Sequence, residues 1–178
     1  DVDMILLATS TPNNTFPASA VDIQHRLGMK HGAAFDLQAV CSGFVFAITT
    51  ADNYIKAGSA KRILVIGAET FSRILDWEDR TTCVLFGDGA GAVVVEACPA
   101  EETAYIGSHL GSDGKSTDIL HVPVGGTAEP LTAENMNDGR QYLTMNGPEV
   151  FKQAVTMMAA AATATVDESH LTADQIRW

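Results

Sequence analysis

The chain contains short, continuous apolar runs and a longer stretch in which apolar residues recur every three or four positions. Met4–Ala8 is such a continuous run, typical of a strand that is covered on both faces, and Arg62–Gly67 is predicted as another buried strand. Ala33–Gln38 is predicted as a further strand between them. Ser42–Ala57 has the spacing of an amphipathic helix, and Gly58 is a suitable stop for it. A strand, a helix and a strand in this order predict a parallel βαβ unit with a right-handed crossover.

Two more helices are predicted from their end signals. Ser19 is the expected N-cap of the first, and Gly28 ends it. Asn146 is the expected N-cap of the last, with Glu149 at the capping-box position, and this helix continues into an alanine-rich stretch that ends near Val166. The mixture of strands and helices predicts an α/β protein.

The region after the third strand is rich in glycine. Two neighbouring strands, Cys83–Phe86 and Ala92–Val95, are predicted on either side of Gly87–Gly91. The glycine run fits neither of two common phosphate-binding motifs, so we interpret it as a tight turn with close backbone packing. Residues 111–141 are rich in Gly, Asp, Thr and Asn and are expected to form a long surface loop.

Composition narrows the class of protein. The 178 residues are 46% hydrophobic and 19% charged, which is typical of soluble globular domains. The net charge of -11 argues against nucleic acid as a general partner, because phosphate binding requires clustered Lys and Arg. No apolar run approaches the roughly 20 residues that span a bilayer. One apolar strand follows Asp3 directly and another is predicted to start at Ile176–Trp178, so we expect a portion of a longer protein.

The strongest candidate for chemistry is Cys41. It follows the predicted strand Ala33–Gln38 and precedes the helix that begins at Ser42, so it stands at the carboxyl end of a parallel strand, where α/β folds place their sites. The unpaired amides and the positive dipole end of that helix favour the thiolate, which is the nucleophilic form. Position alone leaves open a second interpretation, a buried structural cysteine.

The other reactive side chains are weaker candidates. Cys83, inside an apolar run, and Cys98, before Pro99, are expected to be inert. The cysteines have neither close pairing nor metal spacing, which favours a reducing, cytoplasmic setting without a metal site. Nothing in the sequence pairs a histidine with Cys41, so none is assigned as a catalytic base; the five are His25, His31, His109, His121 and His170.

Several segments together resemble β-ketoacyl-ACP synthase III, and they follow one another in the order found in that family. The resemblance covers nearly the whole chain and is weakest between Gly111 and Gln141. The segments are Asp36–Phe44, Gly67–Arg73, Asp79–Ala92, Leu143–Gly147 and Glu149–Lys152.

This resemblance implies a thiolase-like fold, which is layered α-β-α-β-α in the full enzyme. Residues 1–100 would form most of the N-terminal half, which carries the nucleophile, and residues 101–178 would begin the C-terminal half. It also implies a cytoplasmic homodimer that acts as an acyltransferase in fatty acid biosynthesis. No cofactor is expected, because acyl-CoA is a substrate.

The reaction that the resemblance implies is acyl transfer followed by a decarboxylative Claisen condensation. Cys41 takes an acyl group, usually acetyl, from acyl-CoA to give an acyl-enzyme. Malonyl-ACP then loses carbon dioxide, and its carbanion attacks the thioester to give a β-ketoacyl-ACP. The backbone amide of Cys41 would contribute to an oxyanion hole.

The resemblance also assigns residues to an acyl pocket. Phe16 is similar to the residue that reaches across the family's dimer into the acyl pocket of the other subunit. Phe71, Phe86 and Leu143 resemble residues that line the pocket, although Phe86 and Leu143 would be apolar in any core.

Four further residues resemble contacts to CoA and to the carrier protein. Arg80 resembles an arginine near the CoA nucleotide, where a guanidinium can bind phosphate or stack on adenine. Gly147 and Phe151 resemble contacts along the pantetheine tunnel. Lys152 resembles part of a basic patch that receives the acidic carrier protein.

In the family, a His and an Asn promote decarboxylation. This sequence contains no residues that match them. Three interpretations therefore stay open: a synthase III, a related transferase of secondary metabolism with another acyl donor, and a non-catalytic fragment. Without the His and Asn, we expect the 178-residue portion to be inactive alone. A cysteine hydrolase is disfavoured, because no His–Asn or His–Asp partners are visible.

Overall fold

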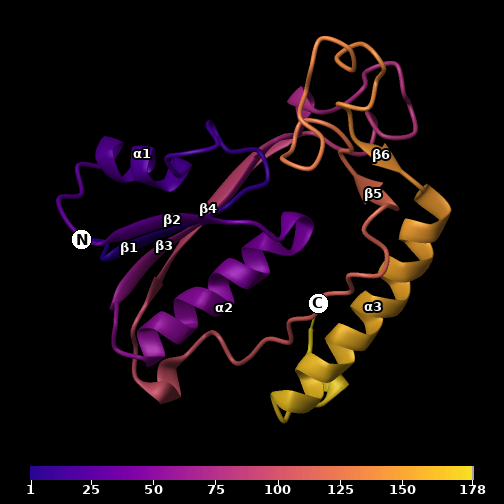
Figure 1. Ribbon diagram of the computed structural model, residues 1–178. Helices are drawn as coiled ribbons and strands as arrows, with labels where there is room; N and C mark the ends of the chain where they lie inside the picture. Colours follow the sequence, from indigo (N-terminus) through magenta and orange to yellow (C-terminus); the bar gives the residue numbers. More distant parts are fainter. Residues whose placement is uncertain (178) are drawn as a thin grey trace. The chain divides into compact units, whose positions relative to one another are not determined.

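The computed structural model describes residues 1–177 and divides into two compact units. The first, called the sheet unit, comprises Asp1–Thr70 and Asp88–Ser108. The second, called the α3 unit, comprises Phe71–Gly87 and His109–Trp178. Both mix strands and helices, as the α/β prediction requires (Figure 1). These units are defined by compactness, so the boundary expected near residue 100 between two thiolase halves stays a prediction.

A four-stranded sheet with the order β2-β1-β3-β4 forms the centre of the sheet unit. Strands β1, β2 and β3 are parallel, and β4 runs antiparallel beside β3. Helices α1 and α2 lie on opposite faces of this sheet (Figure 1). The bounds are β1 Met4–Ala8, α1 Ser19–Arg26, β2 Ala33–Leu37, α2 Gly43–Lys56, β3 Arg62–Thr70 and β4 Asp88–Glu96.

Strand β1 is buried on both faces, as its continuous apolar sequence predicts. Leu6 packs in a cluster with Ala47 and Ala51 of α2, whereas Ile5 packs in a second cluster with Ala20 of α1. All five residues of β1 are buried. The predicted unit of β2, α2 and β3 is also confirmed as parallel, and its two strands flank β1 rather than each other.

Of the two strands predicted around a glycine turn, Ala92–Val95 is confirmed as part of β4, whereas the strand at Cys83–Phe86 and the turn between the two are wrong. Residues 81–85 form turns, and β4 runs without a break from Asp88 to Glu96 through the glycines. Gly89 pairs with Glu69 and Gly91 with Gly67, because β3 is longer than expected and offers its backbone to this whole segment. The prediction of close backbone packing around these glycines is wrong as well, because a Cβ added at Gly87, Gly89 or Gly91 would meet nothing within 4 Å.

The N-cap assigned to Ser19 is wrong. Ala18 occupies the cap position, and Ser19 is the first helical residue, whose Oγ accepts a hydrogen bond from the Asn13 amide at 3.0 Å. The first amides of α1, those of Ser19 and Ala20, donate instead to the carboxylate of Asp36 at 2.8 Å each. A side chain from strand β2 therefore supplies the cap.

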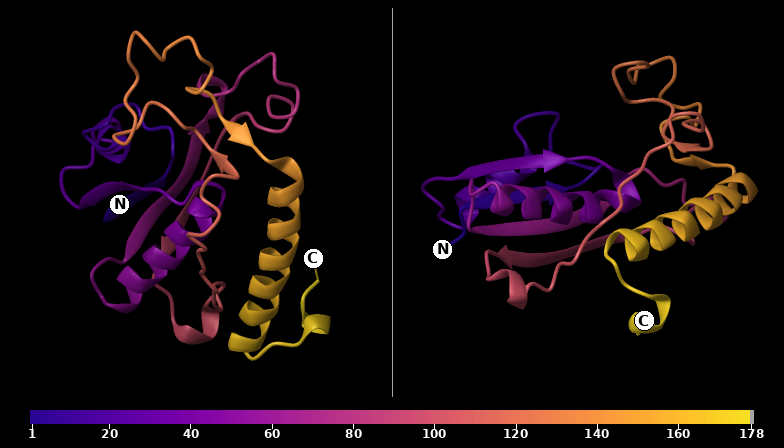
Figure 2. Two further views of the ribbon diagram at one scale, coloured as in Figure 1. Left: turned by 45° about the vertical axis from the view of Figure 1, so that its right-hand side comes forward. Right: turned by 90° about the horizontal axis from the view of Figure 1, so that it is seen from below.

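The α3 unit combines a long helix with a small two-stranded antiparallel sheet. Helix α3 (Gly147–Glu168) is uninterrupted in both views of Figure 2, and β5 (Leu120–His121) pairs with β6 (Thr144–Met145). The predicted cap is confirmed, because the Asn146 side chain accepts from the Glu149 amide. Within residues 1–177 no helix is both long and apolar enough to cross a bilayer.

The remaining loop predictions have mixed outcomes. Residues 111–141 are mostly irregular, as expected, with β5 as the strand within them. The predicted strand at Ile176–Trp178 has no counterpart at Ile176 and Arg177, which are in no strand, and Trp178 lies outside the described residues.

Candidate active site

Cys41 lies where strand β2 ends and helix α2 begins. It occupies the middle of a single 3-10 turn, Val40–Ser42, and α2 starts at the next residue, Gly43. Its side chain is exposed, which does not fit the alternative of a buried structural cysteine. The expected position, at a parallel strand end and a helix N-terminus, is therefore what the fold shows.

The backbone around Cys41 is tightly constrained. Val40 has a φ of 47°, in the left-handed region that β-branched residues avoid. A Cβ added at Gly43 would lie only 3.0 Å from the Cβ of Ala8, so a larger residue would push the start of α2 away from β1. Sequence reasoning missed the role of both residues in shaping the turn.

Replacing Val40 with asparagine should stabilise the protein. Asparagine tolerates the left-handed region, whereas a β-branched side chain there costs about 1–2 kcal/mol. Val40 is 47% exposed, so little apolar burial is lost. We expect the free energy of unfolding of the full-length protein, measured by urea denaturation, to rise by about 1 kcal/mol for Val40→Asn.

Val45→Asn is the matched control for this prediction. Val45 is 49% exposed and lies within α2, where its backbone is helical. Valine and asparagine have similar helix propensities, so this change should give no gain. Equal changes in unfolding free energy at Val40 and Val45 would contradict the strain assigned to Val40.

Three of the expected acyl-pocket residues come together in the α3 unit. Phe71 and Phe86 are stacked with ring centroids 5.6 Å apart, and Leu143 belongs to the same hydrophobic cluster. Phe71 and Leu143 are each only 7% exposed. This packing fits a structural core as well as the wall of a pocket. Phe16 belongs to the sheet unit and is 82% exposed in the segment between β1 and α1.

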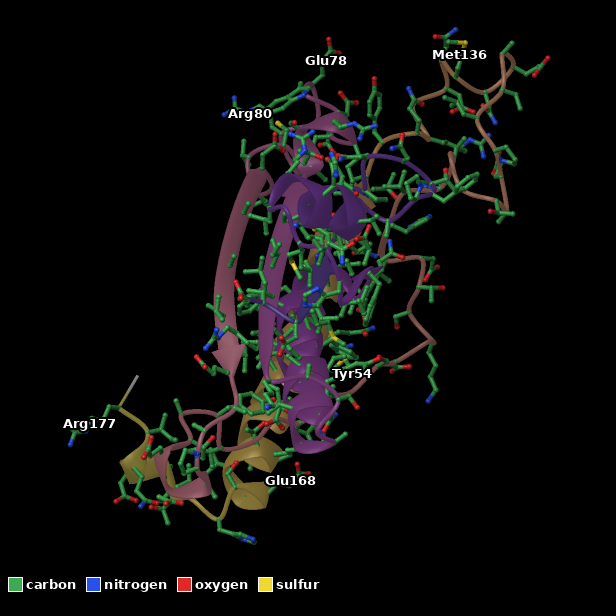
Figure 3. The ribbon with its side chains drawn as sticks, turned by 90° about the vertical axis from the view of Figure 1, so that its left-hand side faces the viewer. Tyr54, Glu78, Arg80, Met136, Glu168 and Arg177 are labelled. Carbon is green, nitrogen blue, oxygen red and sulfur yellow. The ribbon has the colours of Figure 1, made fainter. Side chains whose placement is uncertain are left out.

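Arg80 extends from an ordered turn in the α3 unit (Figure 3). The carboxylate of Asp79 accepts hydrogen bonds from the Thr81 hydroxyl at 2.6 Å, the Thr81 amide at 2.9 Å and the Thr82 hydroxyl at 3.0 Å. These bonds, those from Thr81 foremost, hold the pKa of Asp79 below its usual value. Thr82 is fully buried, so the backbone of the turn is anchored, and Arg80 extends from it exposed.

The first turns of α3 carry the remaining expected contacts. Gly147 is the first residue of the helix and Phe151 lies one turn later on the same side. Phe151 is 72% exposed. The Lys152 side chain is 76% exposed, and its ion pair with Glu149 is long, at 3.9 Å. The start of α3 therefore presents an exposed aromatic side chain and an exposed cation.

Comparison with known proteins shows similarity to one family. Residues 35–114, which include Cys41, match the family model of 3-oxoacyl-[acyl-carrier-protein (ACP)] synthase III. A β-ketoacyl-[acyl-carrier-protein] synthase III of Allorhizobium ampelinum is 57% identical over 182 residues, which cover 100% of this chain and 54% of that relative. Over its whole length the chain is similar to synthase III enzymes. It spans about half the length of the curated relatives it matches.

Solved structures confirm the expected thiolase-like α/β fold. The synthase III of Aquifex aeolicus VF5 superposes with a TM-score of 0.83 at 40% identity, covering 98% of this chain and 52% of that one. The priming β-ketosynthase of a polyketide biosynthetic pathway gives 0.82 at 30% identity, covering 96% and 50%. The similarity to synthase III structures therefore extends over nearly the whole chain.

The other cysteines and the histidines were weaker candidates for chemistry. Cys83 is half-buried, with its thiol 3.7 Å from the Trp77 carbonyl oxygen, and Cys98 is exposed. His109 pairs through Nδ1 with Glu168 at 3.0 Å. Within residues 1–177 no group of three or more His, Cys, Asp and Glu side chains is arranged to bind a metal ion. The inert roles expected for Cys83 and Cys98 stay predictions.

Proposed function

We propose that the full-length synthase III protein containing this chain is an acyltransferase that uses Cys41 as its nucleophile. The observation that carries the proposal is the exposed Cys41 thiol at the junction of β2 and α2, within the segment that matches the family model. An accessible sulfur at a helix N-terminus suits a thiol that must meet a large substrate.

The proposed reaction has two stages. The Cys41 thiolate attacks the thioester carbonyl of an acyl-CoA, and the CoA thiolate leaves. Acetyl-CoA is the donor that we use as a probe. Malonyl-ACP then loses carbon dioxide, and the resulting carbanion attacks the acyl-enzyme to give a β-ketoacyl-ACP and release the Cys41 thiolate. Amides at the start of α2 have no partner within the helix, and the Cys41 amide is our candidate donor to the oxyanion.

The other site assignments belong to the same proposal. Arg80 would bind the CoA nucleotide, and its exposure on an ordered turn supports this. Gly147, Phe151 and Lys152 would contact pantetheine and the carrier protein from the start of α3.

The acyl pocket and the setting of the enzyme are also proposed. Phe71, Phe86 and Leu143 would line the pocket, together with Phe16 of the other subunit of a homodimer. The chemistry described requires no cofactor, and a cytoplasmic role in fatty acid biosynthesis is the setting that fits these substrates.

A second function is a priming transferase of secondary metabolism with a different acyl donor. The similarity to the priming β-ketosynthase of a polyketide pathway, at 30% identity, supports this second function. The two functions share the Cys41 acyl-enzyme and differ in the acyl group. A non-catalytic role remains our expectation only for the 178 residues taken alone.

Intact-mass measurement of the full-length protein tests the proposal. After incubation with acetyl-CoA we expect one added acetyl group, whereas a branched or longer acyl-CoA supplied in parallel should add less. A preference for the longer donor would instead support the secondary-metabolism function. A folded protein that takes no acyl group from any donor would overturn both.

A further inference from the structure

The segment between β1 and α1, residues 9–18, carries Phe16 and is called here the Phe16 loop. At its beginning, the Glu69 carboxylate from the end of β3 accepts three hydrogen bonds. They come from the Ser10 amide and the Ser10 hydroxyl, both at 2.8 Å, and from the Thr11 hydroxyl at 2.7 Å. The Thr11 oxygen in turn accepts from the Thr70 amide at 2.8 Å. Glu69 thereby fixes the start of the loop to β3.

The end of the Phe16 loop is held by a second carboxylate from another strand. Asp36 of β2 accepts from the Ser19 amide through Oδ2 and from the Ala20 amide through Oδ1, each at 2.8 Å. Ser19 is buried, and its hydroxyl accepts from the Asn13 amide at 3.0 Å. The loop is therefore closed between Asn13 and Ser19, with Phe16 at its exposed tip.

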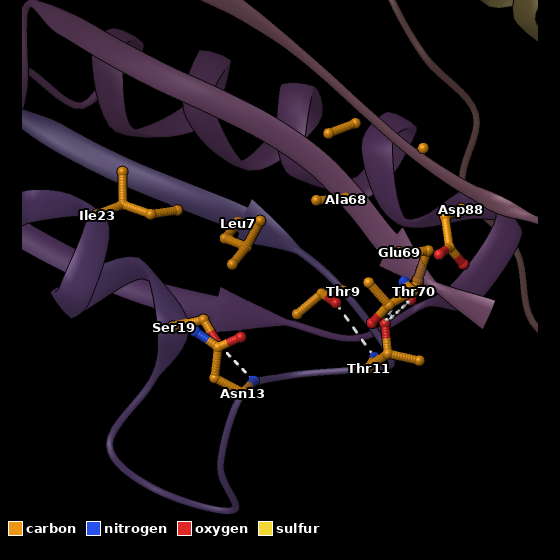
Figure 4. A pocket seen from close by; sticks show the side chains of 12 residues that line it. Leu7, Thr9, Thr11, Asn13, Ser19, Ile23, Ala68, Glu69, Thr70 and Asp88 are labelled. Carbon is orange, nitrogen blue, oxygen red and sulfur yellow. Dashed lines mark hydrogen bonds between the residues drawn. The ribbon is translucent and has the colours of Figure 1, made fainter. Parts of the chain in front are cut away.

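A pocket of about 370 Å³ lies beside the loop, and Figure 4 shows side chains that line it. Thr11 and Glu69 lie at one side, and Asn13 and Ser19 at the other. Residues 12–17 of the loop are all exposed and so have little packing to hold them, which leaves the position of the loop dependent on these polar contacts. Removing one contact should shift the loop more than it changes the fold.

We propose that Glu69 and Asp36 are positioning residues that set acyl-chain preference by fixing the Phe16 loop. This inference rests on the proposed function, in which Phe16 reaches the acyl pocket of the other subunit. Asp36 also lies on the strand that leads directly to Cys41, so the loop and the nucleophile share one support. A small shift of the loop then changes the room for an acyl chain while the reacting thiol stays in place.

Charge explains why carboxylates are needed at both points. An ionised carboxylate is purely an acceptor and can take several amide and hydroxyl donors at once, and such bonds are stronger than those between neutral groups. In glutamine or asparagine an NH₂ group replaces one carboxylate oxygen, so that a donor then faces another donor. The shape stays the same, so the change acts on the hydrogen bonds.

Glu69→Gln and Asp36→Asn in the full-length protein test the inference. We compare kcat and KM for acetyl-CoA and hexanoyl-CoA. The ratio of kcat/KM between the two donors should change by about threefold or more in each variant, mainly through the KM of the longer donor. Asp22→Asn is the control: Asp22 is an exposed α1 carboxylate paired with Arg26, and its ratio should equal that of the wild type.

The Phe16→Ala background separates positioning from general damage. If the carboxylates act through Phe16, adding Glu69→Gln to Phe16→Ala should change the donor ratio no further. An unchanged ratio in Glu69→Gln, or an equal change with and without Phe16, would overturn the inference. Glu69→Gln alone decides the matter if Asp36→Asn does not fold. A wild type that takes no acyl group would instead overturn the proposed function itself.

Discussion

Cys41→Ala in the full-length protein is expected to abolish both acylation and condensation. The substituted side chain offers no sulfur to the acyl-CoA thioester, so no acyl-enzyme can form. The condensation rate should fall by at least about 1,000-fold, as is usual when a covalent nucleophile is removed. A continuous assay of CoA release gives the rate, and intact mass should show no acyl adduct. Cys41 lies on the protein surface in a short turn, so the variant should fold normally.

The two other cysteines supply matched controls for this result. Cys83→Ala and Cys98→Ala remove thiols of different exposure, since Cys83 is half-buried and Cys98 is exposed. Both variants should keep the acyl adduct and a rate within about threefold of the wild type. An adduct that persists in Cys41→Ala and disappears in Cys98→Ala would show that exposure, rather than position at the start of α2, selects the reacting thiol.

Elements with local signals could be predicted from the sequence. The apolar run of β1, the periodic face of α2 and the Asn146 cap of α3 each depend on residues within a few positions, and each is confirmed. The position of Cys41 follows from the same signals, because a strand and a helix meet there. The chemical role proposed for Cys41 came from the family resemblance, since position alone also allowed a structural cysteine.

Features that depend on distant partners could not be predicted in this way. The glycines of β4 have low strand propensity, and only the backbone of β3 makes them a strand. The cap of α1 comes from Asp36, which lies 17 positions after Ser19 in the chain. Glu69 reaches Thr11 across 58 positions. A single sequence carries no local signal for such pairs, so the contacts of the Phe16 loop were found only in the structure.

The central strand offers the second large effect. Ile5→Ala and Leu6→Ala should each lower the free energy of unfolding of the full-length protein by about 3 kcal/mol, because each removes a fully buried side chain and leaves a cavity. Leu6 faces the α2 side of the sheet and Ile5 the α1 side, and their clusters are separate. Urea denaturation of each single variant measures both costs.

The comparison between these neighbours tests the architecture as well as the size of the effect. In a strand covered on one face only, residues next to each other alternate between core and solvent, so one substitution would cost little. Two similar losses require helices on both faces of β1. Leu27→Ala is the control, since Leu27 is 58% exposed at the end of α1 and should cost less than about 1 kcal/mol. A large cost at Leu6 with a small one at Ile5 would show that α1 does not cover its face of the sheet.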